Sequence, residues 1–314
     1  FMGITRLASF VYPLLSFLIL IILYLLYEQL GDQNYAIVPG VLFVFIPNII
    51  LMPLFLDQVL YPLLFLMGAY LAYLTAKKQK LSLAIITGGF IYLANYFSFS
   101  LLALFPFVVL IIGFDYLINF HDRKLGKLIK LIIGLGIGLG ILYLIFQLIL
   151  GYDFLARYEE AMYVHRHHDF VVRVESGVED AANKQFQPPL EQVLRAMLLN
   201  NVEIFSWLGF PVALLFLYRA IRTVARFYQW GISLGQRRLS AVDGMFGAFI
   251  VTFFALNLFG QTQGEVGRLW LFLVPMFVLF ASAEIPILFR NRNRGLYLVI
   301  FLQMITILLI FKFQ

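Results

Sequence analysis

The 314-residue chain contains no cysteine and few charged residues: Asp, Glu, Lys and Arg together make up 13% of it. The absence of cysteine excludes disulfide bonds, thiol nucleophiles and cysteine-ligated metal or iron–sulfur sites, and it leaves the compartment open. A soluble domain is typically about a quarter charged, so this chain has too little polar surface to cover itself in water. Hydrophobic residues make up 62% of the chain and its mean hydropathy is +0.91, which indicates an integral membrane protein.

The apolar runs have the length of transmembrane helices. Most are about 17 to 22 residues long, as a helix needs to cross roughly 30 Å of hydrocarbon. No run alternates between polar and apolar residues, which excludes an outer-membrane barrel. We therefore predict an all-α fold, a single polytopic transmembrane helical bundle over residues 1–314. It has about ten spans, near residues 8–27, 37–56, 60–76, 81–98, 100–120, 129–151, 200–219, 244–260, 266–285 and 296–313.

The net charge of +6 is unevenly distributed. Four loops of the ten-span arrangement, 77–80, 121–130, 219–238 and 290–294, hold 15 of the 23 Lys and Arg residues and lie on one face. Basic residues in short loops stay on the cytoplasmic side, so we expect this face in the cytoplasm and the protein in the cytoplasmic (inner) membrane. The net charge divides into about +9 inside and −3 outside, which removes the case for a nucleic-acid partner.

This orientation places Phe1 outside the membrane. An extracytoplasmic N-terminus requires a cleaved signal or a preceding span, and Phe1, Met2 and Gly3 offer neither. We expect natural sequence upstream of Phe1; the alternative is a short exported N-terminus.

Two connections are longer than the rest. Residues 152–199 form an acidic extracytoplasmic loop, whose last part, 190–200, is expected to be a helix along the membrane surface. Residues 219–243 form a basic cytoplasmic connection. Arg222, Arg226 and Trp230 suit the headgroup zone, so this connection is either an interfacial amphipathic helix or a solvated linker.

Polar residues at the outer ends of spans are the candidate site, because charge near hydrocarbon is costly and marks function. Asp57 is predicted in a tight outer turn, Leu56 to Gln58, where its carboxylate would bind a divalent cation or orient a substrate hydroxyl. The alternative is that Asp57 only caps the helix that begins near Leu60.

Residues 260–270 combine three glycines with Gln263, Glu265 and Arg268 just before a span. A guanidinium in a first helical turn matches phosphate oxygens bidentately, so these three side chains are candidate substrate-binding residues. The alternative is that Arg268 reaches lipid headgroups and pairs with Glu265.

His165, His167 and His168 lie in the long outer loop. Their spacing does not place all three imidazoles on one helical face, and no companion ligands are evident, so a zinc site is not expected. These histidines either contact a sugar or phosphate or are solvated. Gly134, Gly136, Gly138 and Gly140 lie inside a span and contain two overlapping G-x-x-x-G spacings, which allow close helix packing in lipid.

Four segments share a further pattern. Residues 6–9 open a span, 47–64 contain a helix pair with an Asp-containing outer turn, 264–271 begin a late helix with Arg268, and the histidine-containing loop 152–199 precedes Asn200 and Asn201. This pattern resembles the C-type (GT-C) superfamily of integral membrane glycosyltransferases. Members take a sugar from a polyprenyl-phosphate donor on the extracytoplasmic face. They place a catalytic acidic residue in the loop between their first two helices, and that loop is not present in this chain.

The resemblance implies transfer of a sugar from a polyprenyl-phosphate donor to an extracytoplasmic lipid, glycan or protein acceptor. Arg268 would stabilise the leaving phosphate, Asp57 would assist a divalent cation or the acceptor, and the main base would lie upstream of Phe1. No cofactor is otherwise expected; membrane lipid is the expected surrounding. The alternative is a non-catalytic accessory subunit of a larger membrane protein complex, since 34 Phe and 17 Tyr fit packing against other subunits.

Overall fold

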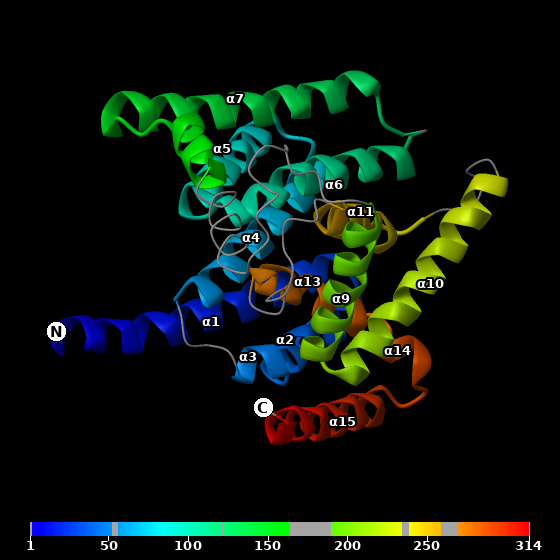
Figure 1. Ribbon diagram of the computed structural model, residues 1–314. Helices are drawn as coiled ribbons and strands as arrows, with labels where there is room; N and C mark the ends of the chain where they lie inside the picture. The colour runs from blue at the N-terminus through cyan, green and yellow to red at the C-terminus, as the bar shows by residue number, and fades with distance from the viewer. Residues whose placement is uncertain are drawn as a thin grey trace.

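The computed structural model describes residues 2–51, 56–120, 122–163, 190–233, 239–258 and 269–313. All regular structure within these ranges is helical (Figure 1). The helices are α1 (Met2–Leu30), η1 (Gln33–Tyr35), α2 (Val38–Val44), α3 (Pro47–Leu51), α4 (Leu56–Lys78), α5 (Leu81–Phe97), η2 (Phe99–Ala103), α6 (Leu104–Ile118), α7 (Leu125–Leu150), α9 (Leu190–Leu208), α10 (Phe210–Ile232), α11 (Ala241–Leu258), η4 (Leu271–Leu273), α13 (Val274–Ser282), α14 (Ile285–Leu288) and α15 (Arg292–Phe313).

Seven helical stretches in these ranges are long and apolar enough to cross a membrane, and an eighth is formed if the bent pair α9 and α10 is one span. The integral membrane class and the all-helical fold are therefore confirmed, while ten spans stay a prediction. One expected span is a short helix and two others are broken. Residues 81–98 form the 17-residue α5, residues 37–56 contain the separate helices α2 and α3, and residues 200–219 are broken at Gly209.

Each break has a local cause. A proline disfavours helical backbone in the residue before it, and Pro47 follows the two residues that separate α2 from α3. Gly209 has φ +82° between α9 and α10, a conformation that side chains with a Cβ rarely adopt. The axes of α9 and α10 differ by 120°. In the bend, the Gln303 amide donates a hydrogen bond of 2.6 Å to the carbonyl oxygen of Leu208, and a buried carbonyl freed from its helix needs such a partner.

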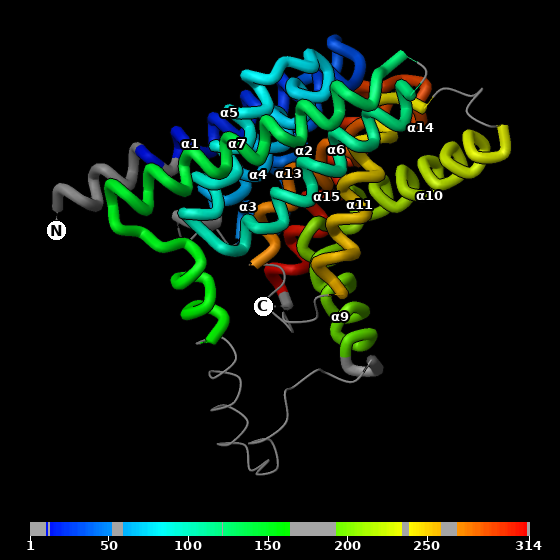
Figure 2. The backbone as a smooth tube through the Cα atoms, turned by 90° about the horizontal axis from the view of Figure 1, so that it is seen from above, coloured from blue at the N-terminus to red at the C-terminus, as the bar shows by residue number. Residues whose placement is uncertain are grey.

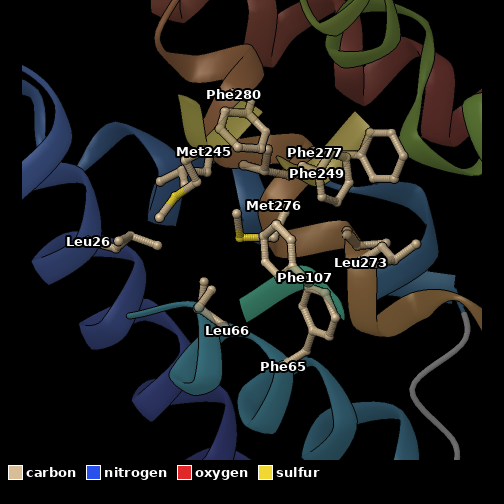
Figure 3. Packing of buried hydrophobic residues seen from close by; sticks show 14 of the residues in the cluster. Leu26, Phe65, Leu66, Phe107, Met245, Phe249, Leu273, Met276, Phe277 and Phe280 are labelled. Atoms are coloured by element: carbon tan, nitrogen blue, oxygen red, sulfur yellow. The ribbon is translucent and has the colours of Figure 1, made fainter. Parts of the chain in front are cut away.

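The helix α13 forms the centre of the bundle. All of its residues are buried, and it packs against α1, α2, α4, α10 and α11. Figure 3 shows aromatic rings of α4, α6, α11 and α13 meeting there. Phe277 lies edge-on to Phe249, with ring centroids 4.9 Å apart, and Phe65 stacks on Phe107 at 5.1 Å. Edge-to-face and offset-stacked pairs are the favoured aromatic geometries, so these rings fix how α13 sits among its neighbours.

The glycine series in α7 packs this helix closely on α5. A Cβ at Gly138 would overlap the carbonyl oxygen of Ile85, and one at Gly88 would overlap that of Leu135. By contrast, a Cβ at Gly136 or Gly140 would meet nothing within 4 Å. The predicted close packing is confirmed for one of the two spacings, and the other faces away from the bundle.

The peripheral helices carry the lipid-facing surface. Only 22% of the span Leu125–Leu150 and 17% of the span Arg292–Lys312 is buried. Their outward side chains are large and apolar, such as Leu148 and Phe301. Such a surface is stable in contact with lipid acyl chains.

Candidate functional site

The predicted outer-face residues are placed only in part. Asp57 lies in the first turn of α4, which begins at Leu56. The prediction of a tight turn at Leu56 to Gln58 is therefore wrong, because these residues are already helical and α3 ends at Leu51. The helix also begins at Leu56, before the expected start near Leu60, and the capping role of Asp57 stays a prediction. The Asp57 side chain lies outside the described part of the structure.

The other predicted site residues fall outside the described ranges. They are Gln263, Glu265 and Arg268, within 259–268, and His165, His167 and His168, within 164–189. Their roles stay predictions.

The helices that flank these segments pack together. Ring centroids of Phe65 on α4 and Phe272 in η4 are 5.2 Å apart, and Trp270 lies edge-on to Phe253 of α11 at 5.9 Å. Phe65 follows Asp57 by eight residues, about 12 Å along a helix, and Trp270 follows Arg268 by two. The start of α4 and residues 269–270, which precede η4, therefore lie at the same end of the bundle.

Buried amides gather at this end. Asn201 donates to the Asn257 side-chain oxygen at 3.4 Å and to the carbonyl oxygen of Met197 at 2.7 Å. Asn48 and Asn200 are also buried, on the neighbouring helices α3 and α9. A buried amide is costly unless it is hydrogen-bonded, and these amides form a polar layer at this end of the bundle.

A second polar cluster, which the sequence did not predict, lies on α10, α11 and the residue before α14. Arg219 is 3% exposed and donates to two carboxylates: to Asp243 at 2.6 Å and to Glu284 at 3.1 Å. Asp243 and Glu284 are 1% and 0% exposed. We call Arg219, Arg222, Arg226, Asp243 and Glu284 the buried charge cluster.

The rest of the cluster neutralises the two carboxylates. Arg222 pairs with Glu284, and Arg226 pairs with Asp243 at 3.0 Å. Ser240 and Asp243 bond reciprocally, the Asp243 carboxylate accepting from the Ser240 backbone N–H at 3.0 Å while Ser240 Oγ accepts from the Asp243 N–H at 3.2 Å. This is the capping-box arrangement at a helix start. Each carboxylate has at least two cationic partners. The cluster therefore links α10 to α11 and to the start of α14, and neither carboxylate is free to act as a base.

The helix α10 is therefore amphipathic, with its charged side against the protein and its apolar side exposed. Its three arginines face the protein, while its exposed side carries an apolar stripe: Phe210, Leu214, Leu217, Ile221, Val224 and Tyr228. Both views show the C-terminal half of α10 extending away from the bundle (Figure 2). Residues 219–232 are helical, and Arg222 and Arg226, which one of the two alternatives assigns to the headgroup zone, are paired with buried acids. The interfacial position of this helix stays a prediction. The three- and four-residue spacing of the stripe was the sequence signal for this face.

The ends of several helices meet at the basic face. Arg292 donates to Asp32 at 2.5 Å, Lys77 donates to the Gln29 side chain at 2.8 Å, and Arg123 donates to the Ala76 carbonyl at 2.7 Å. The loops 77–80, 122–130 and 290–294 are thus on one side of the bundle, as their charge predicted. The Arg292 hydrogen bond, assisted by the Asn34 backbone N–H, holds the pKa of Asp32 below its ordinary value.

No cluster of His, Asp or Glu suited to a metal ion is found in the part of the chain that the structure describes. No protein-family model, curated protein or solved structure matches the chain. The likeness to the C-type glycosyltransferases thus depends on the sequence pattern alone.

Proposed function

We propose that the protein is a membrane glycosyltransferase that uses a polyprenyl-phosphate-linked sugar, with its site at the end of the bundle opposite the basic loops. One observation carries this proposal. The helix α4, which begins next to Asp57, packs on η4, which begins three residues after Arg268. A donor phosphate and an acceptor hydroxyl need such a convergence of groups from separate spans.

The proposed chemistry assigns each outer residue a task. The acceptor oxygen attacks the anomeric carbon while the bond from that carbon to the phosphate oxygen breaks, and polyprenyl phosphate leaves with the electron pair. A carboxylate takes the hydroxyl proton, with Asp57 assisting the acceptor or a divalent cation. The Arg268 guanidinium offsets the charge that grows on the phosphate, and Gln263, Glu265 and the histidines of 164–189 contact donor or acceptor.

Binding of the carrier tests the proposal independently of the sugar and the acceptor. A chain in which Trp207 and Trp230 are replaced by Phe retains Trp270 as its single tryptophan, two residues from Arg268. We expect undecaprenyl phosphate, added to this protein in phosphatidylcholine nanodiscs, to change the fluorescence of Trp270 saturably.

Arg268→Gln should weaken this binding by about 10- to 100-fold, the range for loss of a charged hydrogen-bonding partner. Arg195→Gln is the matched control, because Arg195 is exposed on α9 and its removal changes the net charge equally; it should change binding less than twofold. No binding by the parent protein, or equal losses in both variants, would refute the carrier site.

The second candidate is an accessory subunit of a larger membrane complex. The observation that favours it is the continuous apolar stripe on α10, which projects from the bundle. Under this alternative, the protein solubilised from its own membrane migrates well above 36.2 kDa with a partner in fixed ratio, and Ile221→Ser with Val224→Ser releases that partner. Carrier binding without a partner would exclude this alternative.

A further inference from the structure

A basic depression lies between α14 and α15, at the opposite end from the proposed sugar site. It has a volume of about 600 Å³ and opens to the surface. It is lined by Tyr35, Arg290, Asn291, Arg292, Asn293 and Arg294. Three of these six residues are cationic and none is acidic.

One of the three arginines is fixed by its neighbours. Arg292 donates to Asp32 at 2.5 Å, and its guanidinium lies 4.7 Å from the centre of the Tyr35 ring. The Asn291 side chain accepts a hydrogen bond of 3.1 Å from the backbone N–H of Arg294. These contacts neutralise Arg292 and hold the loop in place.

The other two arginines have no counter-ion among the residues that the structure describes. Arg290 and Arg294 are exposed, and neither guanidinium makes an ion pair with any residue that the structure describes. Two unneutralised arginines that line one depression favour an anion with several oxygens, because guanidinium binds phosphate oxygens in a bidentate manner.

The surroundings of the depression indicate where that anion comes from. The depression separates the end of one candidate span, Leu271–Leu288, from the start of another, Arg292–Lys312. Ile287 and Leu288 before it, and Tyr297 after it, are exposed and apolar. An anion held by Arg290 and Arg294 therefore lies at the level where hydrocarbon ends, with apolar protein surface beside it.

We propose that this depression binds the phosphate headgroup of an anionic phospholipid, whose acyl chains lie along the exposed apolar surface of α14 and α15. A phospholipid matches both the basic depression and the apolar surface beside it. Its phosphate would bind the Arg290 and Arg294 guanidinium groups, and its acyl chains would cover the apolar side chains. The site is independent of the proposed sugar transfer and uses none of its residues.

The test compares lipids that differ in headgroup charge. The purified full chain, in a neutral detergent, is titrated with phosphatidylglycerol or with phosphatidylcholine of the same acyl chains, and bound lipid is counted by native mass spectrometry. The parent protein should bind one phosphatidylglycerol far more tightly than phosphatidylcholine. Arg290→Gln with Arg294→Gln should reduce that affinity about 30-fold, because each cation near an anionic surface contributes about fivefold.

Lys127→Gln with Lys130→Gln is the matched control. Both lysines are exposed at the start of α7, on the same face, and their loss changes the net charge by the same amount. This variant should bind phosphatidylglycerol within about twofold of the parent. Equal losses in the two double variants would overturn the proposal, because overall charge would then account for binding.

Free phosphate is the alternative source of the anion. If millimolar inorganic phosphate displaces phosphatidylglycerol completely, or if the parent protein does not prefer phosphatidylglycerol, the lipid site is refuted. Melting temperatures of all variants in phosphatidylcholine alone check that each is folded, and a variant that has lost its melting transition is replaced by the single Arg290→Gln change.

Discussion

Removing one carboxylate from the buried charge cluster should destabilise the protein far more than removing a surface carboxylate. Asp243→Asn keeps the shape of the side chain and removes its charge. Arg219, which is 3% exposed, would then keep only Glu284 as a partner, whereas Arg226, with a side chain 40% exposed, would be rehydrated. The loss of stability should therefore come mainly from the Arg219–Asp243 ion pair.

The size of the effect follows from burial. Breaking a buried pair by removing one partner costs about 3–5 kcal/mol, and Glu284 remains to offset part of the Arg219 charge, so we expect about 3 kcal/mol for Asp243→Asn. Glu160→Gln is the control: Glu160 pairs with Arg157 at 2.8 Å, and both side chains are 62% exposed. An exposed pair of this kind contributes about 0–1 kcal/mol.

The assay is equilibrium unfolding by SDS in mixed micelles, followed by tryptophan fluorescence. A double-mutant cycle adds Arg219→Met. In the double variant no charge is left without its partner at the Arg219–Asp243 contact, so its destabilisation should fall short of the sum of the single changes by about 2 kcal/mol. Two results would refute the stabilising role of the buried charge cluster. One is that the two single effects add within about 0.5 kcal/mol in the double variant; the other is that Asp243→Asn destabilises no more than Glu160→Gln.

Three further outcomes follow from the packing. Gly138→Ala should force α7 from α5 and lower the melting temperature, whereas Gly136→Ala, facing open space, should leave it unchanged or raise it. Gly209→Ala should strongly destabilise the fold, because Gly209 has a positive φ and its added Cβ would overlap the Gln303 amide. Gln303→Leu should lower the free energy of unfolding by about 1–3 kcal/mol. The midpoints of unfolding measure both effects. Near neutral pH the parent should be more stable than Asp32→Asn. This difference should vanish as pH falls through the lowered pKa of Asp32, and melting curves recorded at a series of pH values measure it.

The expected spans agree best where a helix is continuous. Predicted residues 60–76, 100–120 and 244–260 correspond to the observed spans Val59–Lys78, Phe99–Ile118 and Ala241–Leu258. In lipid a helix must satisfy its own backbone groups, so a long apolar run determines its own structure. Hydropathy averages over a run, however, and it is insensitive to single residues such as Pro47 and Gly209 that break one.

The glycine series shows a second limit. The sequence contains the two spacings Gly134 with Gly138 and Gly136 with Gly140, and both allow close packing. Two residues in a helix correspond to a rotation of about 200°, so the two pairs point to opposite sides and only one can face α5. The choice between them depends on the position of α5, which only the tertiary structure provides.

The buried charge cluster changes how the charge of the basic face is counted. Five basic residues on that face are ion-paired: Arg123, Arg219, Arg222, Arg226 and Arg292. Thirteen of the 15 Lys and Arg residues of that face lie in the described part of the chain, and eight of these thirteen make no ion pair with a described residue. The predicted orientation therefore depends on unpaired side chains such as Lys127, Arg290 and Arg294. Two of these three, Arg290 and Arg294, line the depression between α14 and α15, so the proposed headgroup site uses two of the residues on which the predicted orientation depends.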